Sequence, residues 1–327
     1  MRAIVITKPG DLASLQVRPV DRPEPGPGEI RVRVHACGLN RADLLQAKGQ
    51  YPAPDGVPAD IPGLEFAGEV EAVGPGGLGP HQVGHRVFGV VAGAAFAEFV
   101  VCHQRVAVAI PANLDYEAAA AVPEAFLTAH DALERRGGVQ AGERVLVHAV
   151  GGGVGSAAVQ LAHAMGCRVF GTSRTADKLE QMTGYGLDEP IDTSREDFAS
   201  SVRDRSGGRG VHVIIDFLGA PALAGNLDAL ATGGRLVSVG TLGGTAAEVD
   251  LGVVMKKRLI VVGTTLRSRP IEEKIALSLA FGDRVAPWLE RGVVRPIVDR
   301  VFAFDDIAGA VERMSSNLGF GKVVLRL

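Results

Sequence analysis

The clearest chemical signal in the sequence is a group of glycines between a strand-like run and a helix-like run. The apolar run RVLVHA covers residues 144–149, and the glycines that follow it are Gly151, Gly152, Gly153 and Gly155. In a dinucleotide-binding turn, glycines let backbone N–H groups approach a pyrophosphate, and the start of the next helix adds partial positive charge. The turn therefore predicts a dinucleotide site.

The glycine pattern departs from the strict motif at one place. Gly152 and Gly155 fit the second and third glycine positions, Val154 lies between them, and Val150 stands at the first position. The alternative interpretation is a flexible glycine loop with no ligand. The order of strand, turn, helix and second strand at the right spacing favours the dinucleotide.

The end of the second strand-like run, residues 168–173, indicates which dinucleotide is bound. NAD sites usually place an acidic residue there, whereas this chain has Ser173, Arg174 and, one helical turn on, Lys178. Two cations can form strong charge-assisted bonds to a 2′-phosphate, which predicts NADPH. The alternative is a solvated helix start.

The elements that must position these residues change in kind along the chain. Residues 1–122 consist of short strand-like runs separated by Gly and Pro, and the tail after residue 267 is mixed. Between them strands and helices alternate, which predicts a parallel, doubly wound sheet. The strand-like runs are 144–149, 168–173, 211–217, 235–239 and 258–264, and the helix-like runs include 155–165, 176–183 and 221–231. A longer helix is expected at 270–291.

Composition excludes several classes of protein. The 327 residues carry a net charge of −3, and no basic stripe indicates a nucleic-acid partner. Charged residues, glycines and prolines interrupt every apolar run, so no membrane span is expected. Cys37, Cys102 and Cys167 are too widely spaced for a disulfide framework or a metal cluster. We expect a soluble, cytoplasmic protein.

Several segments together resemble one family along nearly the whole chain. They are LNRADLLQAKGQY, PGLEFAGEV, VPEAFLTA, VQAGERVLVHA, GVGSAAVQLA, LRSR and GKVVL. In this order they are similar to the zinc-free quinone oxidoreductase branch of the medium-chain dehydrogenase/reductase superfamily. The resemblance implies an α/β protein with a GroES-like β-barrel catalytic domain at 1–123, completed by 267–327. It also implies a Rossmann NADPH-binding domain, with its doubly wound parallel sheet, at 124–266.

The resemblance makes the absence of zinc an expectation. Zinc-dependent relatives have an early Cys, a Gly-His-Glu motif and a four-cysteine loop. Here Cys37 stands at the first place, but Leu64 replaces the histidine and residues 84–105 contain one cysteine. Catalytic zinc needs three protein ligands, so we expect no metal and interpret Cys37 as a core residue.

The resemblance also implies a set of site residues. Asn40 and Thr128 are expected near the nicotinamide, with Asp43 beside them among the cofactor contacts. Tyr51 is expected to stack on a flat acceptor and donate a hydrogen bond to its oxygen, and Arg267 to bind that oxygen or the cofactor. As alternatives, Asp43 caps its helix or pairs with Arg41, and Thr128 bonds back within its helix. Further cofactor contacts are implied at Gly240, Leu266, Gly321 and Lys322. Asp192 stands where relatives often have a Tyr that covers the adenosine phosphate, which weakens the expected preference for NADPH.

These residues predict an NADPH-dependent, zinc-independent reductase of quinones. Two other classes stay open. Relatives of this outline reduce the C=C bond of enals, enones or enoyl thioesters, a reaction that needs a proton donor, for which Tyr51 is the candidate. Other relatives are crystallin-like or bind RNA, and the mild acidity argues against RNA binding here.

The apolar strand RLIVVGTTLR is expected at the edge of the Rossmann sheet. It lacks the charges and prolines that usually protect an edge. We predict a two-fold homodimer through residues 258–265, as in relatives. The alternative is a monomer whose edge is covered by the helix that begins near Ile271.

Overall fold

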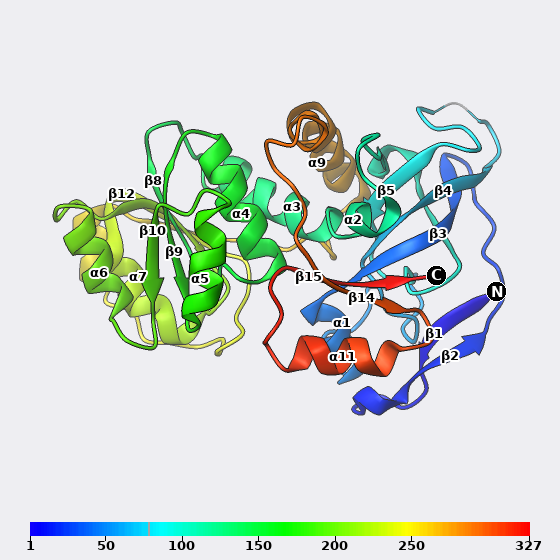
Figure 1. Cartoon of the computed structure of the whole chain (residues 1–327), viewed down its shortest axis with the longest axis horizontal. Helices are drawn as coiled ribbons and strands as arrows, with labels where there is room; N and C mark the ends of the chain where they lie inside the picture. The colour runs from blue at the N-terminus through cyan, green and yellow to red at the C-terminus, as the bar shows by residue number, and fades with distance from the viewer. Residues whose placement is uncertain (78) are drawn as a thin grey trace. The chain divides into compact units, whose positions relative to one another are not determined.

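The computed structural model describes residues 1–77 and 79–327 and divides the chain into two compact units (Figure 1). Unit 1 comprises Met1–Leu127 and Leu266–Leu327, and unit 2 comprises Thr128–Thr265. Sequence analysis placed the first boundary at residue 123, where helix α3 (Pro123–His130) begins. The structure places it inside this helix, so one element contributes residues to both units.

Unit 1 contains a sheet of mostly antiparallel strands, in the order β14-β15-β3-β4-β5-β7, with β6 also paired to β3. The last strand, β15, pairs with β3, and β14 pairs with β15, which explains why unit 1 needs the residues from Leu266 onward. The strands are β3 (Glu29–Leu39), β4 (Glu65–Val73), β5 (Arg86–Val90), β6 (Phe99–His103), β7 (Val108–Ala109), β14 (Val298–Ala303) and β15 (Lys322–Arg326). Alternate apolar residues of these strands form a common core that includes Ile30, Val32, Phe66 and Val100.

Shorter elements complete unit 1. A separate hairpin pairs β1 (Arg2–Ile6) with β2 (Leu15–Pro19). The helices are α1 (Arg41–Ala47), α2 (Tyr116–Ala120), α9 (Ile271–Arg284), α10 (Ala286–Glu290) and α11 (Ile307–Ser315). The helix predicted at 270–291 is thus two helices, because Pro287 has no N–H to continue the hydrogen-bonding pattern of α9.

Unit 2 is a parallel sheet of six strands in the order β10-β9-β8-β11-β12-β13. The strands are β8 (Arg144–Val147), β9 (Arg168–Ser173), β10 (Glu189–Asp192), β11 (Val211–Asp216), β12 (Leu230–Ser238) and β13 (Ile260–Gly263). Counted along the chain, this is the 3-2-1-4-5-6 order of a Rossmann sheet. The predicted doubly wound parallel sheet is therefore confirmed.

The helices of unit 2 connect successive strands. They are α4 (Gly153–Ala164), α5 (Ala176–Thr183), α6 (Phe198–Arg205), α7 (Leu223–Ala229) and α8 (Leu251–Lys257). Sequence analysis did not predict α6 or α8. Helix α6 has the sequence FASSVRDR, in which few apolar residues mark a helical face, although Ala199 and Val202 are buried. Helix α8 buries none of its residues, so it has no core-facing stripe to detect.

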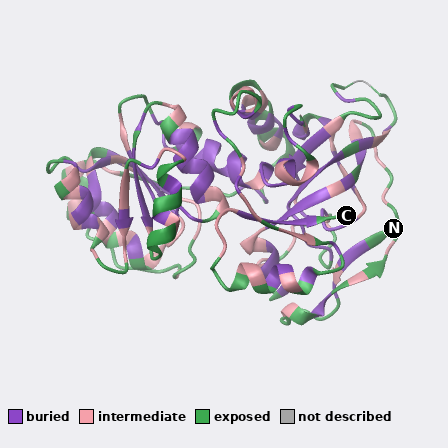
Figure 2. Ribbon diagram, viewed as in Figure 1, coloured by how far each residue is buried: buried purple, intermediate pink, exposed green. Residues whose placement is uncertain are grey.

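Burial follows the two sheets (Figure 2). Strands β8, β9 and β11 are almost wholly buried, as the continuous apolar runs of a parallel sheet require. Within the described residues, no helix is long and apolar enough to cross a membrane.

Candidate functional site

The glycine turn of unit 2 joins strand β8 to helix α4, as the sequence predicted. A Cβ atom at Gly155 would lie 2.4 Å from the carbonyl oxygen of Ala149, so only glycine fits this close approach of helix and loop. Gly152 precedes the helix and is exposed, and its N–H donates to the Ala149 carbonyl at 3.0 Å, which closes the turn. The Val150 side chain is fully buried, so the departure at the first motif position fills the core and leaves the turn unobstructed.

Two cations of unit 2 follow strand β9, which pairs with the strand before this turn. The alkyl chain of Lys178 passes beside Gly151, where a Cβ atom would come within 2.5 Å of Lys178 Cδ. Arg174 is exposed just after strand β9, and it forms no ion pair within residues 1–77 and 79–327. Ser173 Oγ accepts a hydrogen bond from the Thr175 N–H at 3.1 Å, which shapes the chain between the strand and α5.

The acidic residue that sequence analysis noted near this site is Asp192. It is the register partner of Ser173 in the β10–β9 pairing. Its carboxylate accepts hydrogen bonds from the hydroxyl and the N–H of Ser194 at 2.6 and 3.0 Å, and it forms an ion pair with Arg195 at 3.5 Å. The hydrogen bonds from Ser194 lower the pKa of Asp192, so it remains an anion at neutral pH.

A buried histidine that sequence reasoning missed lies at the end of β8. His148 Nδ1 is 2.8 Å from the hydroxyl of Thr172, and Nε2 is 2.7 Å from Asn226 Oδ1. Burial lowers the pKa of His148, so the ring is neutral, and the amide oxygen requires the proton on Nε2. The ring therefore ties the ends of β8 and β9 together. One histidine in the apolar run that precedes the glycines gave no signal for this role.

The site residues of unit 1 meet at a buried ion pair. Glu65 is fully buried, and its carboxylate lies 2.6 Å from Lys322 Nζ. The ammonium also donates to Asn40 Oδ1 at 2.6 Å and to the carbonyl of Leu39 at 2.8 Å. Asn40 Nδ2 donates back to Glu65 at 2.8 Å. Lys322, predicted as a cofactor contact, thus has three protein acceptors for its three N–H bonds and fixes the Asn40 side chain.

Asp43 caps helix α1, which is one of the two alternatives stated for it. Its carboxylate accepts hydrogen bonds from the N–H groups of Asn40 at 2.7 Å and Gly63 at 3.0 Å. Gly63 has φ of +104°, and a Cβ there would meet the Phe96 nitrogen at 2.4 Å. Burial raises the pKa of Asp43 to about 7, although both backbone hydrogen bonds favour the charged form. The residue joins the loop before β4 to the start of α1.

Arg267 is buried in unit 1 and holds the segment that contains Tyr51. Its Nη1 donates to the Tyr51 carbonyl at 3.1 Å, its Nε to the Ala92 carbonyl at 2.7 Å, and its Nη2 to Gln46 Oε1 at 2.6 Å. The guanidinium carbon lies 5.0 Å from the centre of the Tyr51 ring. The described contacts therefore make Arg267 an anchor for Tyr51, and its predicted contact with an oxyanion or cofactor stays a prediction.

The remaining predicted residues fall in both units. Thr128 is buried in unit 2, and within the described chain its hydroxyl has no hydrogen-bond partner, so the back-bonding alternative is wrong. Gly240 follows strand β12 in the same unit. Leu266 and Gly321 belong to unit 1, and Gly321 has φ of +96° with its Cβ position 2.2 Å from the Ile297 carbonyl.

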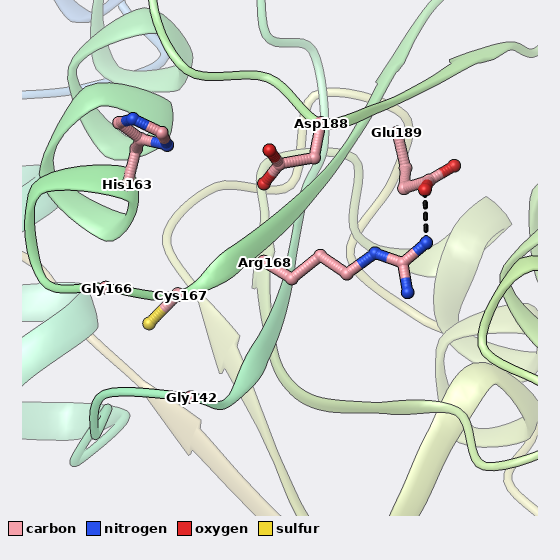
Figure 3. Close-up of a pocket in the computed structure, with 7 residues that line it drawn as sticks. All are labelled: Gly142, His163, Gly166, Cys167, Arg168, Asp188 and Glu189. Carbon is pink, nitrogen blue, oxygen red and sulfur yellow. Dashed lines mark hydrogen bonds and ion pairs between the residues drawn. The ribbon is translucent and has the colours of Figure 1, made fainter.

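A pocket in unit 2 lies away from all of these residues (Figure 3). It has a volume of about 600 Å³ and lies at the amino ends of strands β8, β9 and β10. Arg168 points across it toward Glu189 and pairs with that carboxylate. The lining residues are Gly142, His163, Gly166, Cys167, Arg168, Asp188 and Glu189. Ligands of doubly wound sheets bind at the carboxyl ends of the strands, so this pocket is not part of the candidate site.

The zinc positions of relatives are occupied by core residues. Cys37 is fully buried within strand β3, and burial raises the pKa of its thiol well above the usual range. Leu64 is also buried. Residues 1–77 and 79–327 contain no group of three His, Cys, Asp or Glu side chains that could hold a metal ion.

Family comparisons agree with this architecture. Residues 26–112 match the family model described as alcohol dehydrogenase GroES-like domain, and residues 153–281 match the model described as zinc-binding dehydrogenase. The fold and these matches define an oxidoreductase of the medium-chain dehydrogenase/reductase superfamily.

Matches to individual proteins identify the branch. The chain is 36% identical over 314 residues to a quinone oxidoreductase of Pseudomonas aeruginosa, with 95% of each chain covered. It is also 36% identical over 237 residues to a mycocerosic acid synthase-like polyketide synthase of Mycolicibacterium smegmatis; that match covers 72% of this chain and spans 11% of the synthase. The chain belongs to the zinc-free quinone oxidoreductase-like branch of the superfamily.

Two solved structures are similar to this chain over nearly its whole length. Mycobacterial Rv1454c complexed with NADPH has a TM-score of 0.88 at 29% identity and covers 100% of both chains. CurK enoyl reductase has a TM-score of 0.87 at 28% identity and covers 99% of this chain and 98% of that one.

Proposed function

We propose that this protein is an NADPH-dependent reductase that transfers hydride to quinones without zinc. The observation that carries the proposal is that β9 ends in Ser173 and is followed by the exposed Arg174, where NAD sites have an acidic residue, with Lys178 beside the glycine turn. The similarity to quinone oxidoreductases and to an NADPH-bound neighbour supports it.

The residues of unit 2 fit the dinucleotide. Gly155 allows the close approach of α4 to the loop, and the N–H groups in the first turn of α4, which have no acceptor within the helix, can donate to a pyrophosphate. The buried, unpartnered hydroxyl of Thr128 is a polar group that a ligand can satisfy. NADPH would supply the hydride when bound, and Ser173, Arg174 and Lys178 would hold its 2′-phosphate.

Residues of unit 1 are proposed to bind the acceptor molecule. Tyr51 is partly exposed. Partial burial is the main cause that raises the pKa of its hydroxyl, so the hydroxyl stays protonated at neutral pH. A protonated phenol can donate a hydrogen bond to an acceptor oxygen that gains negative charge. The network of Glu65 and Lys322 holds the Asn40 side chain in one orientation for the same task.

Reduction of activated C=C bonds is the second candidate function. It is supported by the similarity to the polyketide synthase and to CurK enoyl reductase. A steady-state screen of NADPH and NADH against quinones and alkenals distinguishes the two candidates. We expect NADPH-linked turnover with a quinone that persists after chelator treatment. Turnover with alkenals alone would favour the second candidate, and loss of activity with chelator would refute the zinc-free mechanism.

We also propose a two-fold homodimer through strand β13, the last strand of the unit 2 sheet. Ile260 and Val261 in this strand are 55% and 53% exposed, and Leu251 and Met255 of helix α8 are more exposed still. An unprotected apolar edge favours pairing with a second copy. Replacing Val261 with Lys and Val262 with Pro should give monomer or insoluble protein, measured by light scattering. A monomeric wild type at micromolar concentration contradicts the proposal.

A further inference from the structure

Glu124 is a titratable residue of unit 1 that sequence analysis did not select. It lies in the first turn of helix α3, and its N–H donates to Glu65 Oε2 at 2.8 Å. Glu65 therefore connects Glu124 to the same network that holds Asn40 and Lys322. Glu65 and Lys322 are buried, whereas Glu124 is partly exposed. Of these three charged groups, Glu124 is the one that a ligand can reach.

The charged neighbours of Glu124 already have partners. Glu65 is paired with Lys322 at 2.6 Å. Lys274, on helix α9, donates to the Arg267 carbonyl at 2.8 Å. In the part of the chain that the structure describes, the Glu124 carboxyl itself has no hydrogen-bond or ion-pair partner. Its hydrogen-bonding capacity is therefore left for a bound molecule.

Glu124 also shares its surroundings with the predicted acceptor residue. Burial is the main cause that raises the pKa of the Tyr51 hydroxyl, and the negative charge of Glu124 raises it further. Arg267 lies against the Tyr51 ring at 5.0 Å and fixes that segment. An acid and a phenol on neighbouring positions can serve two atoms of one acceptor.

The environment of Glu124 favours its protonated form. Burial raises the pKa of Glu124 to about 8, and the negative charges of Glu65 and Asp43 act in the same direction. The positive charges of Lys322 and Lys274 oppose the shift without cancelling it. Near neutral pH the carboxyl thus holds a proton that it can donate.

We propose that Glu124 is the catalytic acid that protonates a carbon atom during reduction of an activated alkene, while Tyr51 binds the acceptor's carbonyl oxygen. This inference rests on the proposed reductase function. The acceptor's β-carbon gains a hydride with its electron pair from the reduced cofactor, and the C=C π electrons move toward the carbonyl. The O–H bond of Glu124 then breaks as a C–H bond forms at the α-carbon. The Glu124 carboxylate regains its proton from water.

The two acceptor classes should depend differently on this acid. Protonation at carbon is slow and benefits from a positioned donor, whereas the oxygen of a reduced quinone exchanges protons readily with water. Glu124 therefore allows unit 1 to act on activated alkenes as substrates, in addition to the quinone substrates of the proposed function.

The first experiment measures kcat of Glu124→Gln with an alkenal and with a quinone. General acid catalysis contributes about 100-fold or more, so we expect at least that loss with the alkenal and a change below about threefold with the quinone. Wild-type kcat with the alkenal should fall above a pH of about 8, and Glu124→Gln should lack this fall. Glu312→Gln, at an exposed position of α11, is the matched control. Tyr51→Phe should lower kcat with the alkenal but keep the decrease of kcat above a pH of about 8.

A second experiment needs neither cofactor nor acceptor. With glutamate labelled by carbon-13 at the side-chain carboxyl, NMR should detect one resonance that titrates near pH 8 and disappears in Glu124→Gln. If no glutamate titrates there, or if Glu124→Gln keeps both the alkenal rate and its pH dependence, Glu124 is not the acid. A wild type that oxidises NADPH with neither acceptor refutes the proposed function instead, and the NMR titration still reports on Glu124.

Discussion

The two units build their candidate sites in opposite ways. In unit 2 the glycine turn and the cations of the β9–α5 connection lie within about one strand–helix–strand segment, and the key groups are exposed backbone and Arg174. In unit 1 the groups come from Asn40, Glu65, Glu124 and Lys322, far apart in the chain, and are tied by partly buried hydrogen bonds. The first site is suited to bind a charged cofactor, and the second to hold polar groups still during chemistry.

The largest expected effect tests the buried network of unit 1. Lys322→Met leaves Glu65 without its cation, and removing one partner of a buried ion pair costs about 3–5 kcal/mol of unfolding free energy. Urea denaturation measures this loss, and the double variant Lys322→Met with Glu65→Gln should recover part of it. A loss below about 1 kcal/mol, typical of surface ion pairs, would show that the pair does not hold unit 1 together.

The next effect compares two glycines of the unit 2 turn. Gly155→Ala places a Cβ 2.4 Å from the Ala149 carbonyl, whereas at Gly152 the same distance is 3.5 Å. We expect Gly155→Ala to lower both NADPH affinity and stability, the latter by about 1–3 kcal/mol. Gly152→Ala should lower affinity alone, because its added methyl meets the ligand and not the protein.

Equal stability losses in the two glycine variants, measured by urea denaturation, would contradict this distinction. So would unchanged NADPH affinity in Gly152→Ala, measured by fluorescence titration. Either result would indicate that the turn is shaped for folding and not for a pyrophosphate.

The smallest expected effect concerns the unpartnered hydroxyl of Thr128. Thr128→Val removes a group that has no partner in the described residues, so unfolding free energy should change by less than about 0.5 kcal/mol. If the hydroxyl binds the cofactor, the dissociation constant for NADPH should rise about two- to tenfold, since one neutral hydrogen bond contributes about 0.5–1.5 kcal/mol. Thr128→Ser keeps the hydroxyl and should bind as the wild type does. Unchanged affinity in Thr128→Val would remove Thr128 from the site.

The contrast between the units also explains what sequence could predict. Strand β9 (Arg168–Ser173) and helix α5 (Ala176–Thr183) were predicted at their observed bounds, because apolar periodicity and the glycine turn are local signals. The Rossmann order followed from the alternation of strands and helices. Helices α6 and α8 were missed because their apolar residues are few or exposed.

The unit 1 network had no local signal. Glu124 stands in the segment VPEAFLTA, where one glutamate among apolar residues resembles an ordinary first-turn residue of a helix. Its importance depends on Glu65 and Lys322, which pairing of β3 with β4 and β15 brings together. Lys322 was predicted as a cofactor contact, but its ammonium is engaged by three protein acceptors. Such contacts depend on topology, which spacing in one sequence does not reveal.

The claim that unit 2 selects NADPH is tested most directly by the dissociation constants of NADPH and NADH for the wild type and Arg174→Ala. A charge-assisted contact contributes about 1.5–3 kcal/mol, so Arg174→Ala should weaken NADPH binding by about tenfold or more and leave NADH binding nearly unchanged. Arg291→Ala, an exposed arginine of unit 1, controls for the loss of one positive charge. Equal losses for both cofactors in Arg174→Ala, or equal affinity of the wild type for both, would contradict the claim.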